Sequence, residues 1–589
     1  MDNNTLQYYK EKHTTLLKQL SKYNSINKYI AIGKLISFIL AITILVFWYF
    51  NENLNTAVIF IMPATFIILI IFGQKYIDLY TYYSALTSFI QDEIKFAQKD
   101  FTVFRSGGEN INYDHNYAYD LDIFENGAIF HSLNRCTTLE GENLLKEMVL
   151  RPVLSNDEII KYQQAIKEMV GYRDISHEIS SISYKSPSSL TTFISSFKED
   201  IKPPKKSLVI ISYISVFLTI TSFILYGFNI LPSFIPMGLF ILQFAVASLF
   251  TKKTNDEYSS LNKANKASKT YLAVSSAIKK IDFKSEILKD IKSNLENMYN
   301  KIYLLQKINQ EFDQRNSGLY FLISNGLFLK DIFLSYKLNN WIAENKKFIP
   351  LWSKNIALLD VINSISSYTY NNNDFIFPEI DNNTIIKAEN LCHPLIEKEK
   401  RIGNNIEISK TKKFFIITGA NMAGKSTFIR SIGVNLILAC MGAPVCATKF
   451  QFHPVNIFSS MRTSDKLMES SSYFHAELKR LKMLKEKAEK GEEMLMLLDE
   501  ILKGTNSEDK LKGSKLVLMK FITYNVAGIL ATHDTALGVL EKEYSENFEN
   551  YYFDFSLDNQ GEMIFDYKLK KGISQNMNAS ILINNVLES

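Results

Sequence analysis

A phosphate-binding pattern lies in the last third of the 589-residue chain. The run Gly419-Ala420-Asn421-Met422-Ala423-Gly424-Lys425-Ser426-Thr427 has the spacing GxxxxGK[ST]. Glycines let backbone N–H groups wrap a phosphate, and a helix that follows points its positive end at the same group. We therefore predict a nucleotide-binding segment in which Lys425 reaches the β- and γ-phosphates of ATP and Ser426 holds Mg²⁺.

Two further segments carry side chains that a nucleotide hydrolase needs. The apolar run 494–498 ends in Asp499-Glu500, where Asp499 suits Mg²⁺ and Glu500 suits orienting or deprotonating the attacking water. The run 526–530 leads into Ala531-Thr532-His533, which puts His533 in a position to sense the γ-phosphate, although a lone histidine is more often structural. The predicted catalytic residues are Lys425, Glu500 and His533, the metal ligands Ser426 and Asp499, and the cofactors ATP and Mg²⁺.

These segments need strands and a helix to position them. The β-branched and aromatic run 414–418 predicts a strand directly before the glycine-rich loop, and the apolar pattern 428–441 predicts a helix directly after it. Strand, loop and helix in this order are the context that the phosphate-binding pattern requires. We expect an α/β domain over residues 375–589.

The same residues resemble the ATPase domain of the MutS family. Thr418 to Thr427 resembles the family's TGxNMxGKST segment, and 499–509 resembles its DEIxxGTxxxD segment. Asp465, Ser472, Phe474 and Glu477 fall on a further family segment, in which the serine reaches the nucleotide of a partner subunit. The resemblance implies a homodimer with composite sites, in which each nucleotide contacts residues of both subunits. It adds Ser472, Phe474 and Glu477 as signature residues that act on the nucleotide of the partner subunit. His393-Pro394 is similar to the family's HP motif, with Cys392 where arginine is common.

The resemblance extends upstream of this domain. The stretch 133–159 is similar to the start of the MutS core domain, in which a threonine-glycine step opens a helix. It implies an α-helical core with lever helices, together with a C-terminal α/β P-loop ATPase domain of the ABC type. Membership of this family would imply a role in DNA mismatch repair and binding to mismatched DNA.

Long uncharged segments predict a membrane protein. Residues 35–51, 53–74 and 207–251 carry no charge, and a bilayer core of ~30 Å needs about 20 apolar helical residues. We predict four transmembrane helices arranged as two hairpins. Lysines flank both hairpins at their bases and the turns near 51–56 and 227–233 carry none, which predicts that the ATPase domain is cytoplasmic, at a bacterial inner membrane.

The predicted organisation is a multidomain chain. Its parts are a cytoplasmic N-terminal helix (1–29), transmembrane hairpin 1 (30–74), a helical linker (75–117), the first part of a MutS-like core (118–206), transmembrane hairpin 2 (207–251), lever and core helices (252–374) and the ATPase domain (375–589).

The partner is left open by the sequence. A net charge of +5 is too weak to be the electrostatic footprint of a dedicated DNA binder. We expect neither the mismatch-reading domain before residue 120 nor an inserted clamp within 253–347, so an ATPase that acts on lipid or protein is the alternative to one that acts on DNA. An ABC transporter is disfavoured because no LSGGQ-like signature precedes Asp499. The four cysteines indicate neither a zinc site nor a disulfide framework.

Overall fold

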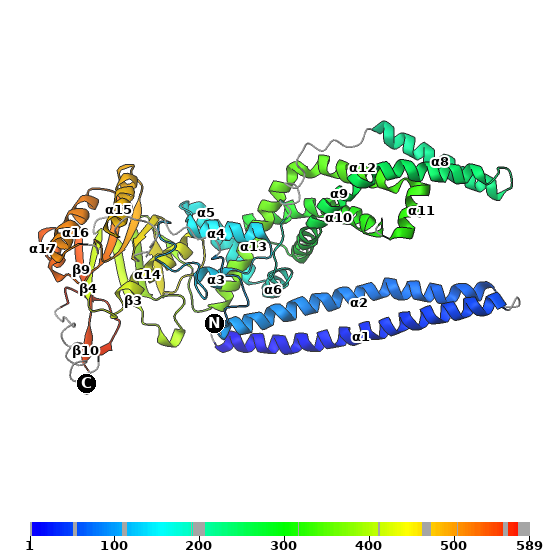
Figure 1. Ribbon diagram of the computed structural model, residues 1–589. Coiled ribbons are helices and arrows are strands. Elements are labelled where there is room, and N and C mark those ends of the chain that lie inside the picture. The colour runs from blue at the N-terminus through cyan, green and yellow to red at the C-terminus, as the bar shows by residue number, and fades with distance from the viewer. Residues whose placement is uncertain are drawn as a thin grey trace.

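A computed structural model describes residues 3–50, 56–108, 115–189, 191, 206–315, 317–409, 413–461, 473–502, 505–557 and 563–574. Within these ranges the molecule is elongated, with the α/β domain at one end and two helical hairpins at the other (Figure 1). A helical core lies between them. The tips of both hairpins point away from the α/β domain, toward the same end of the molecule.

The first hairpin consists of α1 (Asn3–Phe50) and α2 (Thr56–Ala97), which pack along one another. Its base is fixed to the core by a cluster of buried aromatic and aliphatic side chains that includes Tyr9, Phe89 and Tyr184. The N-terminal helix and the first apolar segment are thus one continuous helix.

The core surrounds the long helix α13 (Ile349–Asn371). The other core helices are α3 (Ile129–Leu133), α4 (Leu139–Leu150), α5 (Asn156–Val170) and α6 (Arg173–Ser181). At the start of α4, Thr137 and Thr138 both donate hydrogen bonds to the buried carboxylate of Asp360 on α13, through their backbone N–H groups and their hydroxyls. A Cβ at Gly141 would lie 2.6 Å from the Asp360 side chain, so this step of the sequence requires glycine.

The second hairpin joins the lever helices without a break. Its helices are α8 (Lys206–Gly227) and α9 (Phe234–Ile278), and the levers continue through α10 (Glu286–Arg315), α11 (Gly318–Phe328), α12 (Lys330–Asn345) and the 3₁₀ helix η1 (Lys346–Phe348). Helix α10 buries one apolar stripe, which includes Leu288, Ile291, Leu295 and Met298. The separate apolar helix α11 was not predicted.

Four helices are long and apolar enough to cross a membrane, judged by length and composition alone. They are α1, α2, α8 and α9, the same four that the uncharged segments predict. Only between 6% and 22% of their most apolar windows is buried within the molecule. The apolar surfaces of both hairpins are therefore largely uncovered by the described part of the chain.

The C-terminal domain contains two main sheets. Its strands are β1 (Glu379–Ile380), β2 (Thr384–Leu391), β3 (Asn404–Ser409), β4 (Phe414–Gly419), β5 (Lys449–Phe452), β6 (Asn456–Ser460), β7 (Met494–Asp499), β8 (Val526–Ala531), β9 (Phe548–Phe553), β10 (Phe555–Leu557), β11 (Met563–Phe565) and β12 (Lys570–Lys571). One mixed sheet has the order β1-β5-β2-β3, and the larger sheet has the order β12-β9-β4-β8-β7-β6. Strands β10 and β11 form a separate hairpin.

Helices cover both faces of the larger sheet. They are α14 (Lys425–Cys440), α15 (Tyr473–Glu489), α16 (Ser507–Phe521) and α17 (Val539–Glu543), with the 3₁₀ helices η2 (Lys398–Lys400) and η3 (Thr535–Gly538). Successive residues of β4 point to opposite faces. Phe415 and Ile417 join the large core that includes α14, whereas Phe414 and Ile416 join the cluster under α15, α16 and α17. The predicted α/β domain is confirmed as a sheet covered on both faces.

Candidate active site

The carboxyl ends of three neighbouring parallel strands form the site. Strand β8 lies between β4 and β7, and Ala531 at the end of β8 is in register with both Ile417 of β4 and Asp499 of β7. Because parallel strands end at the same edge of a sheet, the loop after β4, the acidic pair after β7 and the segment after β8 meet there. The three predicted segments are thereby brought together.

The loop after β4 adopts backbone conformations that its glycines make accessible. Gly419 and Gly424 have φ of 140° and 104°, and Met422 has a φ of 67°. A Cβ at Gly419 would lie 2.4 Å from the carbonyl oxygen of Phe553, so no other residue fits there. Helix α14 begins at Lys425 directly after Gly424. The loop and the N-terminus of this helix therefore form the phosphate cradle expected from the sequence.

Lys425 is held inside this cradle. Its ammonium group donates hydrogen bonds of 2.7 Å to the carbonyl oxygens of Gly419 and Ala420. Burial lowers the pKa of Lys425 to about 8, while the carboxylates of Asp499 and Glu500 act in the opposite direction. A phosphate that enters the cradle would meet a positive charge already aimed into it.

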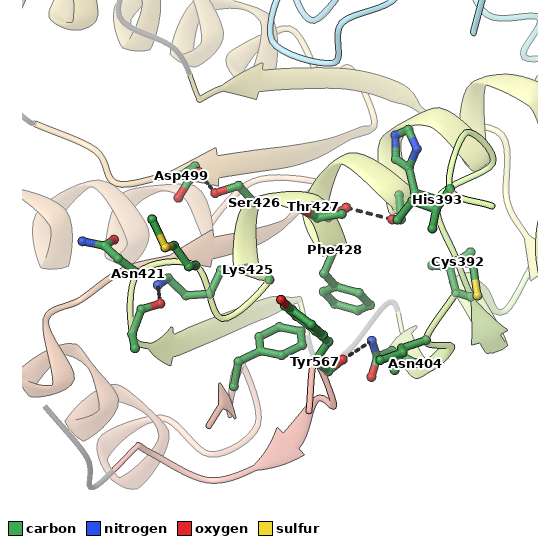
Figure 2. A pocket seen from close by; sticks show the side chains of 18 of the residues that line it. Cys392, His393, Asn404, Asn421, Lys425, Ser426, Thr427, Phe428, Asp499 and Tyr567 are labelled. Carbon is green, nitrogen blue, oxygen red and sulfur yellow. Dashed lines mark hydrogen bonds between the residues drawn. The ribbon is translucent and has the colours of Figure 1, made fainter. Parts of the chain in front are cut away.

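Ser426 and Asp499 form a pair suited to magnesium. The Ser426 hydroxyl donates a 2.5 Å hydrogen bond to Oδ2 of Asp499 (Figure 2). Mg²⁺ prefers oxygen ligands and is commonly bound by one or two protein groups together with substrate phosphates and water. A hydroxyl and a carboxylate side by side, next to a phosphate cradle, fit that donor set.

Glu500 lies between two basic side chains. Its carboxylate oxygens are 3.4 Å from Nε2 of His533 and 3.5 Å from Nζ of Lys510. The Glu500 backbone has a φ of 55°, and its N–H donates to the Ala531 carbonyl at 2.9 Å. This unusual conformation and bond fix the carboxylate at the sheet edge. The sequence alone does not point to Lys510, because this residue lies one turn into α16 and outside the acidic segment 499–509.

The surroundings of His533 favour its neutral form. Burial lowers its pKa, and the positive charge of Lys425 lowers it further. A neutral imidazole offers one nitrogen donor and one acceptor. The structure therefore brings His533 beside Glu500 in a form that can donate one hydrogen bond without adding charge.

A cavity of about 650 Å³ opens beside these groups. Lys425, Ser426, Asp499, Glu500 and His533 line it at one end. The aromatic rings of Phe428 and Tyr567 also face it (Figure 2). Tyr567 has a φ of 50° and its ring lies 3.1 Å from where a Cβ on Gly424 would be. The cavity therefore combines a charged end with an aromatic wall.

Two residues of the HP segment form another wall of the cavity. Burial lowers the pKa of His393 to about 4, so this ring is neutral. Cys392 also lines the cavity, and a hydrogen bond with the thiol of Cys446 lowers its pKa to about 7. The side chain at position 392, where arginine is common in the motif that this segment resembles, thus carries no positive charge.

The structure describes only part of the predicted signature of Ser472, Phe474 and Glu477 that would act in trans. Ser472, together with Asp465 and Gly504, lies outside the described residues, as does the side chain of Phe474. Glu477 on α15 accepts a 2.6 Å hydrogen bond from the N–H of Leu502, in the segment that follows Glu500. Within one subunit, Glu477 thus supports the acidic loop.

Comparison with known proteins gives consistent matches. Residues 415–585 match the family model described as MutS domain V. The chain is 30% identical to MutS protein homolog 4 of Homo sapiens over 251 residues, which is 41% of this chain and 26% of that protein. It is 26% identical to the DNA mismatch repair protein MutS of Finegoldia magna over 523 residues, or 79% of this chain and 59% of that protein. The chain thus matches from about a quarter to three fifths of the length of these relatives.

Proposed function

We propose that this chain is a membrane-anchored ATPase of the MutS family that binds and hydrolyses ATP with Mg²⁺, because residues 415–585 match MutS domain V and MutS proteins match much of the chain. The observation that carries this proposal is the meeting of Lys425, Ser426, Asp499, Glu500 and His533 at one end of a single cavity. Each of these groups has a use in phosphoryl transfer to water.

The residues divide the chemistry among them. The backbone N–H groups of 419–425 and the Lys425 ammonium would hold the phosphates, and Ser426 and Asp499 would hold Mg²⁺. Bound Mg²⁺ would neutralise charge on the β- and γ-phosphate oxygens. Glu500 would orient the attacking water and accept its proton, with Lys510 fixing the carboxylate on one side and the neutral His533 ring lying on the other. His533 would donate to the γ-phosphate, and the aromatic wall of Phe428 and Tyr567 would receive the base.

Membrane anchoring is supported by the way the hairpins distribute their side chains. In α8 the buried residues are Val209, Ser212, Thr219 and Ser222, whereas large apolar residues such as Phe217 and Leu218 are exposed. Helices that pack in lipid are expected to place small and polar residues between them and large apolar residues on the outside. Both tips point the same way (Figure 1), so one bilayer could receive both hairpins with the ATPase domain in the cytoplasm. We place it at a bacterial inner membrane.

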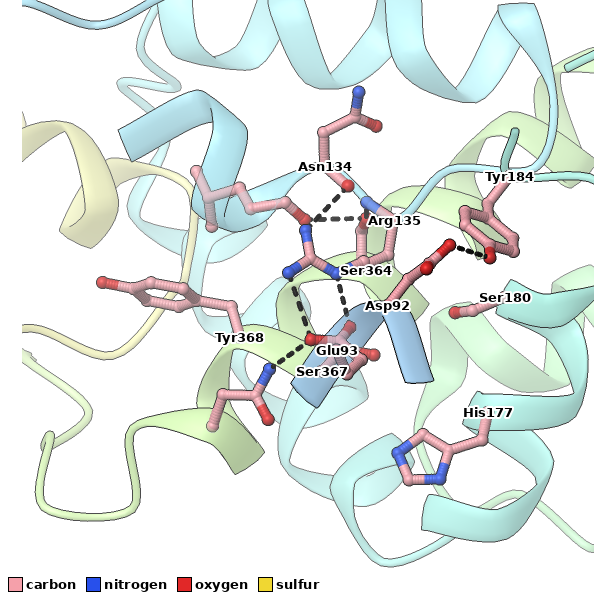
Figure 3. A network of polar contacts seen from close by, with 12 residues as sticks. Asp92, Glu93, Asn134, Arg135, His177, Ser180, Tyr184, Ser364, Ser367 and Tyr368 are labelled. Carbon is pink, nitrogen blue, oxygen red and sulfur yellow. Dashed lines mark hydrogen bonds and ion pairs between the residues drawn. The ribbon is translucent and has the colours of Figure 1, made fainter. Parts of the chain in front are cut away.

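The ATPase domain is connected to the first hairpin through the core. Arg430 on α14 donates to the Asp120 carbonyl at 3.0 Å, and Arg480 on α15 is 3.1 Å from the Asp120 carboxylate. Further along the core, the buried Arg135 binds both carboxylate oxygens of Glu93 on α2, at 2.5 and 3.2 Å (Figure 3). These contacts give the nucleotide cycle a physical route by which to move the hairpin.

The partner on which the cycle acts has two candidates. The names of several relatives include DNA mismatch repair, which supports DNA as the partner. A homodimer with composite sites is part of the same proposal. The alternative is an ATPase acting on lipid or protein, and it is favoured by the levers, because α10 and α12 are joined through the short helix α11 with no room for an inserted clamp.

The distinguishing experiment is ATP turnover of the nanodisc-embedded protein with and without duplex, mismatched and branched DNA. The salt concentration is held fixed, because contacts to DNA phosphates weaken as salt rises. Stimulation by DNA that is lost in Glu500→Gln supports a DNA-processing role at the membrane. Robust turnover that no DNA alters supports the lipid or protein role.

The composite site is tested by mixing two inactive variants. Ser472→Ala removes the group proposed to act in trans, and Lys425→Ala removes the group that acts in cis. A mixed dimer keeps one site with both groups, so mixing should restore part of the activity. Mixed dimers that form, as shown by co-purification of two tags, but stay inactive would contradict a trans role for Ser472.

A further inference from the structure

Helix α11 (Gly318–Phe328) lies at the tip of the levers, between the charged residues Arg315 and Lys330. The whole run 316–329 is uncharged. With 11 residues the helix is about 16 Å long, too short to cross a bilayer core of ~30 Å. In Figure 1 it runs across the direction of α9 instead of along it. Such a helix could lie in the plane of a membrane but could not span one.

Helix α11 turns its small and polar side chains toward the molecule and its large apolar side chains outward. Ser324, Asn325 and Gly326 are buried against the molecule. The exposed residues are large and apolar: Tyr320, Leu322, Ile323 and Phe328, each between 37% and 45% exposed. A helix on the surface of a water-soluble domain normally shows the opposite pattern, with its apolar stripe turned inward. The outward face of α11 is therefore built for apolar surroundings, like the outward faces of the second hairpin.

Helix α11 packs on the apolar part of α9. Phe321 meets Phe244 edge-on with ring centroids 5.9 Å apart, and Phe240 lies directly over Gly326. The first charged residue of α9 is Lys252, and Phe244 and Phe240 precede it by roughly 12 and 18 Å along the helix. These contacts put α11 beside the uncharged part of α9, on the membrane side of Lys252 under the proposed anchoring.

The charges beside α11 are paired. Arg315 binds both oxygens of Asp331 at 2.5 and 2.6 Å and also contacts Asn255 at 2.7 Å. Asn325 of α11 donates to Asp331 at 3.0 Å and accepts from its backbone N–H at 2.9 Å. Both members of the ion pair are buried. Paired and hydrogen-bonded charges are what the base of a membrane-immersed helix requires.

We propose that α11 is an in-plane membrane helix that inserts its outward face into the cytoplasmic leaflet of a lipid bilayer, beside the second hairpin. This inference rests on the proposed membrane anchoring. Continuity with the apolar surface of α9 selects lipid as the occupant. Because α10 ends and α12 begins at α11, the tip of the levers is then fixed to the lipid surface, and any lever motion acts directly on that leaflet.

The test uses an environment-sensitive fluorophore on single cysteines of the full chain in vesicles. Labels are placed at Leu322→Cys on α11, at Leu249→Cys on the apolar part of α9, and at Leu304→Cys on α10 as the matched control. Leu304 is an exposed leucine of a lever helix, 53% exposed. Ile323→Cys replaces Leu322→Cys if that variant misfolds. The background is Cys392→Ser, because the other three cysteines are buried.

Quenching by lipids that carry a spin label in the upper acyl chain gives the answer. The inference expects the α11 and α9 labels to be quenched and the α10 label to stay unquenched and accessible to water. Quenching at α9 with a water-exposed α11 label overturns the inference and leaves the anchoring intact. A blue-shifted α11 label that lipid does not quench means a protein partner or a second copy, and also overturns it. No quenching at either site overturns both proposals.

Discussion

Strand β7 and helix α8 are both almost uncharged apolar segments, yet β7 buries its apolar side chains whereas α8 exposes them. In β7 the residues from Met494 to Leu498 are all buried, and the one charged residue, Asp499, stands at the end where the cavity opens. In α8 the large apolar side chains are exposed, and the buried positions hold mainly serine, threonine and valine.

Under the proposed membrane anchoring, the two regions would meet two different solvents, water and lipid. The α/β domain gains stability by removing apolar area from water, at about 25 cal/mol per Å². The hairpins leave such area outside, which is unfavourable in water and neutral in lipid. Helices in lipid associate through small residues and interhelical hydrogen bonds, such as the 2.9 Å bond from Gln243 to Ser215 between α9 and α8.

The largest expected effect comes from one substitution made in both regions. Leu497→Asp puts an unpaired charge in the fully buried β7 and should destabilise the α/β domain by about 4 kcal/mol or more, abolishing ATP binding. Leu218→Asp lies at the exposed centre of α8 and should leave ATP binding intact while disfavouring insertion by about 2.5–3.5 kcal/mol.

Insertion of that hairpin is measured with a cysteine at Asn229→Cys, in the turn between α8 and α9. An impermeant maleimide added on the side opposite the ATPase domain should label this cysteine in otherwise unchanged protein, and a smaller fraction of it in Leu218→Asp. Equal labelling in both would contradict a lipid-facing role for this surface.

The second effect concerns a buried charge pair outside the apolar segments. Arg135 and Glu93 are nearly inaccessible, so Arg135→Met leaves a buried carboxylate without its partner and should cost about 3–5 kcal/mol. The melting temperature of the nanodisc-embedded protein should fall. Arg135→Met with Glu93→Leu removes both charges and should recover most of the loss. If the single variant melts like the parent, the first hairpin is not fixed to the core by this pair.

The third effect is a pH dependence of ATP binding. With a pKa of about 8 in the free protein, Lys425 is mostly charged below pH 8 and loses its proton above it. Bound phosphates favour the charged form, so ATP affinity should be constant below pH 8 and fall as the pH rises through and beyond it, by up to about tenfold per unit. Lys425→Arg stays protonated and should give a flat profile. A flat profile in the parent protein would contradict the role of burial at this site.

The smallest effect lies inside the second hairpin. Gln243→Leu removes the hydrogen bond to Ser215 and should weaken the pairing of α8 with α9 by about 0.6 kcal/mol, the average found for such bonds between membrane helices. A fluorescence energy transfer pair across the two helices would report the change. A loss of several kcal/mol would mean that polar contacts, more than small-residue packing, hold the hairpin together.

Local patterns predicted much of this molecule, because they depend on neighbours in the chain. The strand before Gly419, the helix from Lys425 and the stripe on α10 follow from runs of apolar residues. The meeting of Lys425, Asp499 and His533 also follows, because parallel strands share an edge.

What was missed depends on partners distant in sequence. Lys510 becomes relevant only because α16 returns to Glu500, and Tyr567 because the chain comes back over Gly424. Arg135 looks like any surface arginine until α2 brings Glu93 to it. Helix α11 was expected only as part of the lever and core helices 252–374, and only its exposure shows that its apolar side chains face outward.

The most direct test of the central claim is Mg²⁺-dependent ATP turnover of the nanodisc-embedded protein beside its Glu500→Gln variant, with ATP binding measured on both. The account predicts turnover in the parent protein, none when Mg²⁺ is chelated, and in the variant ATP that stays bound without being hydrolysed. Equal turnover in the two proteins, or no ATP binding by either, would contradict it.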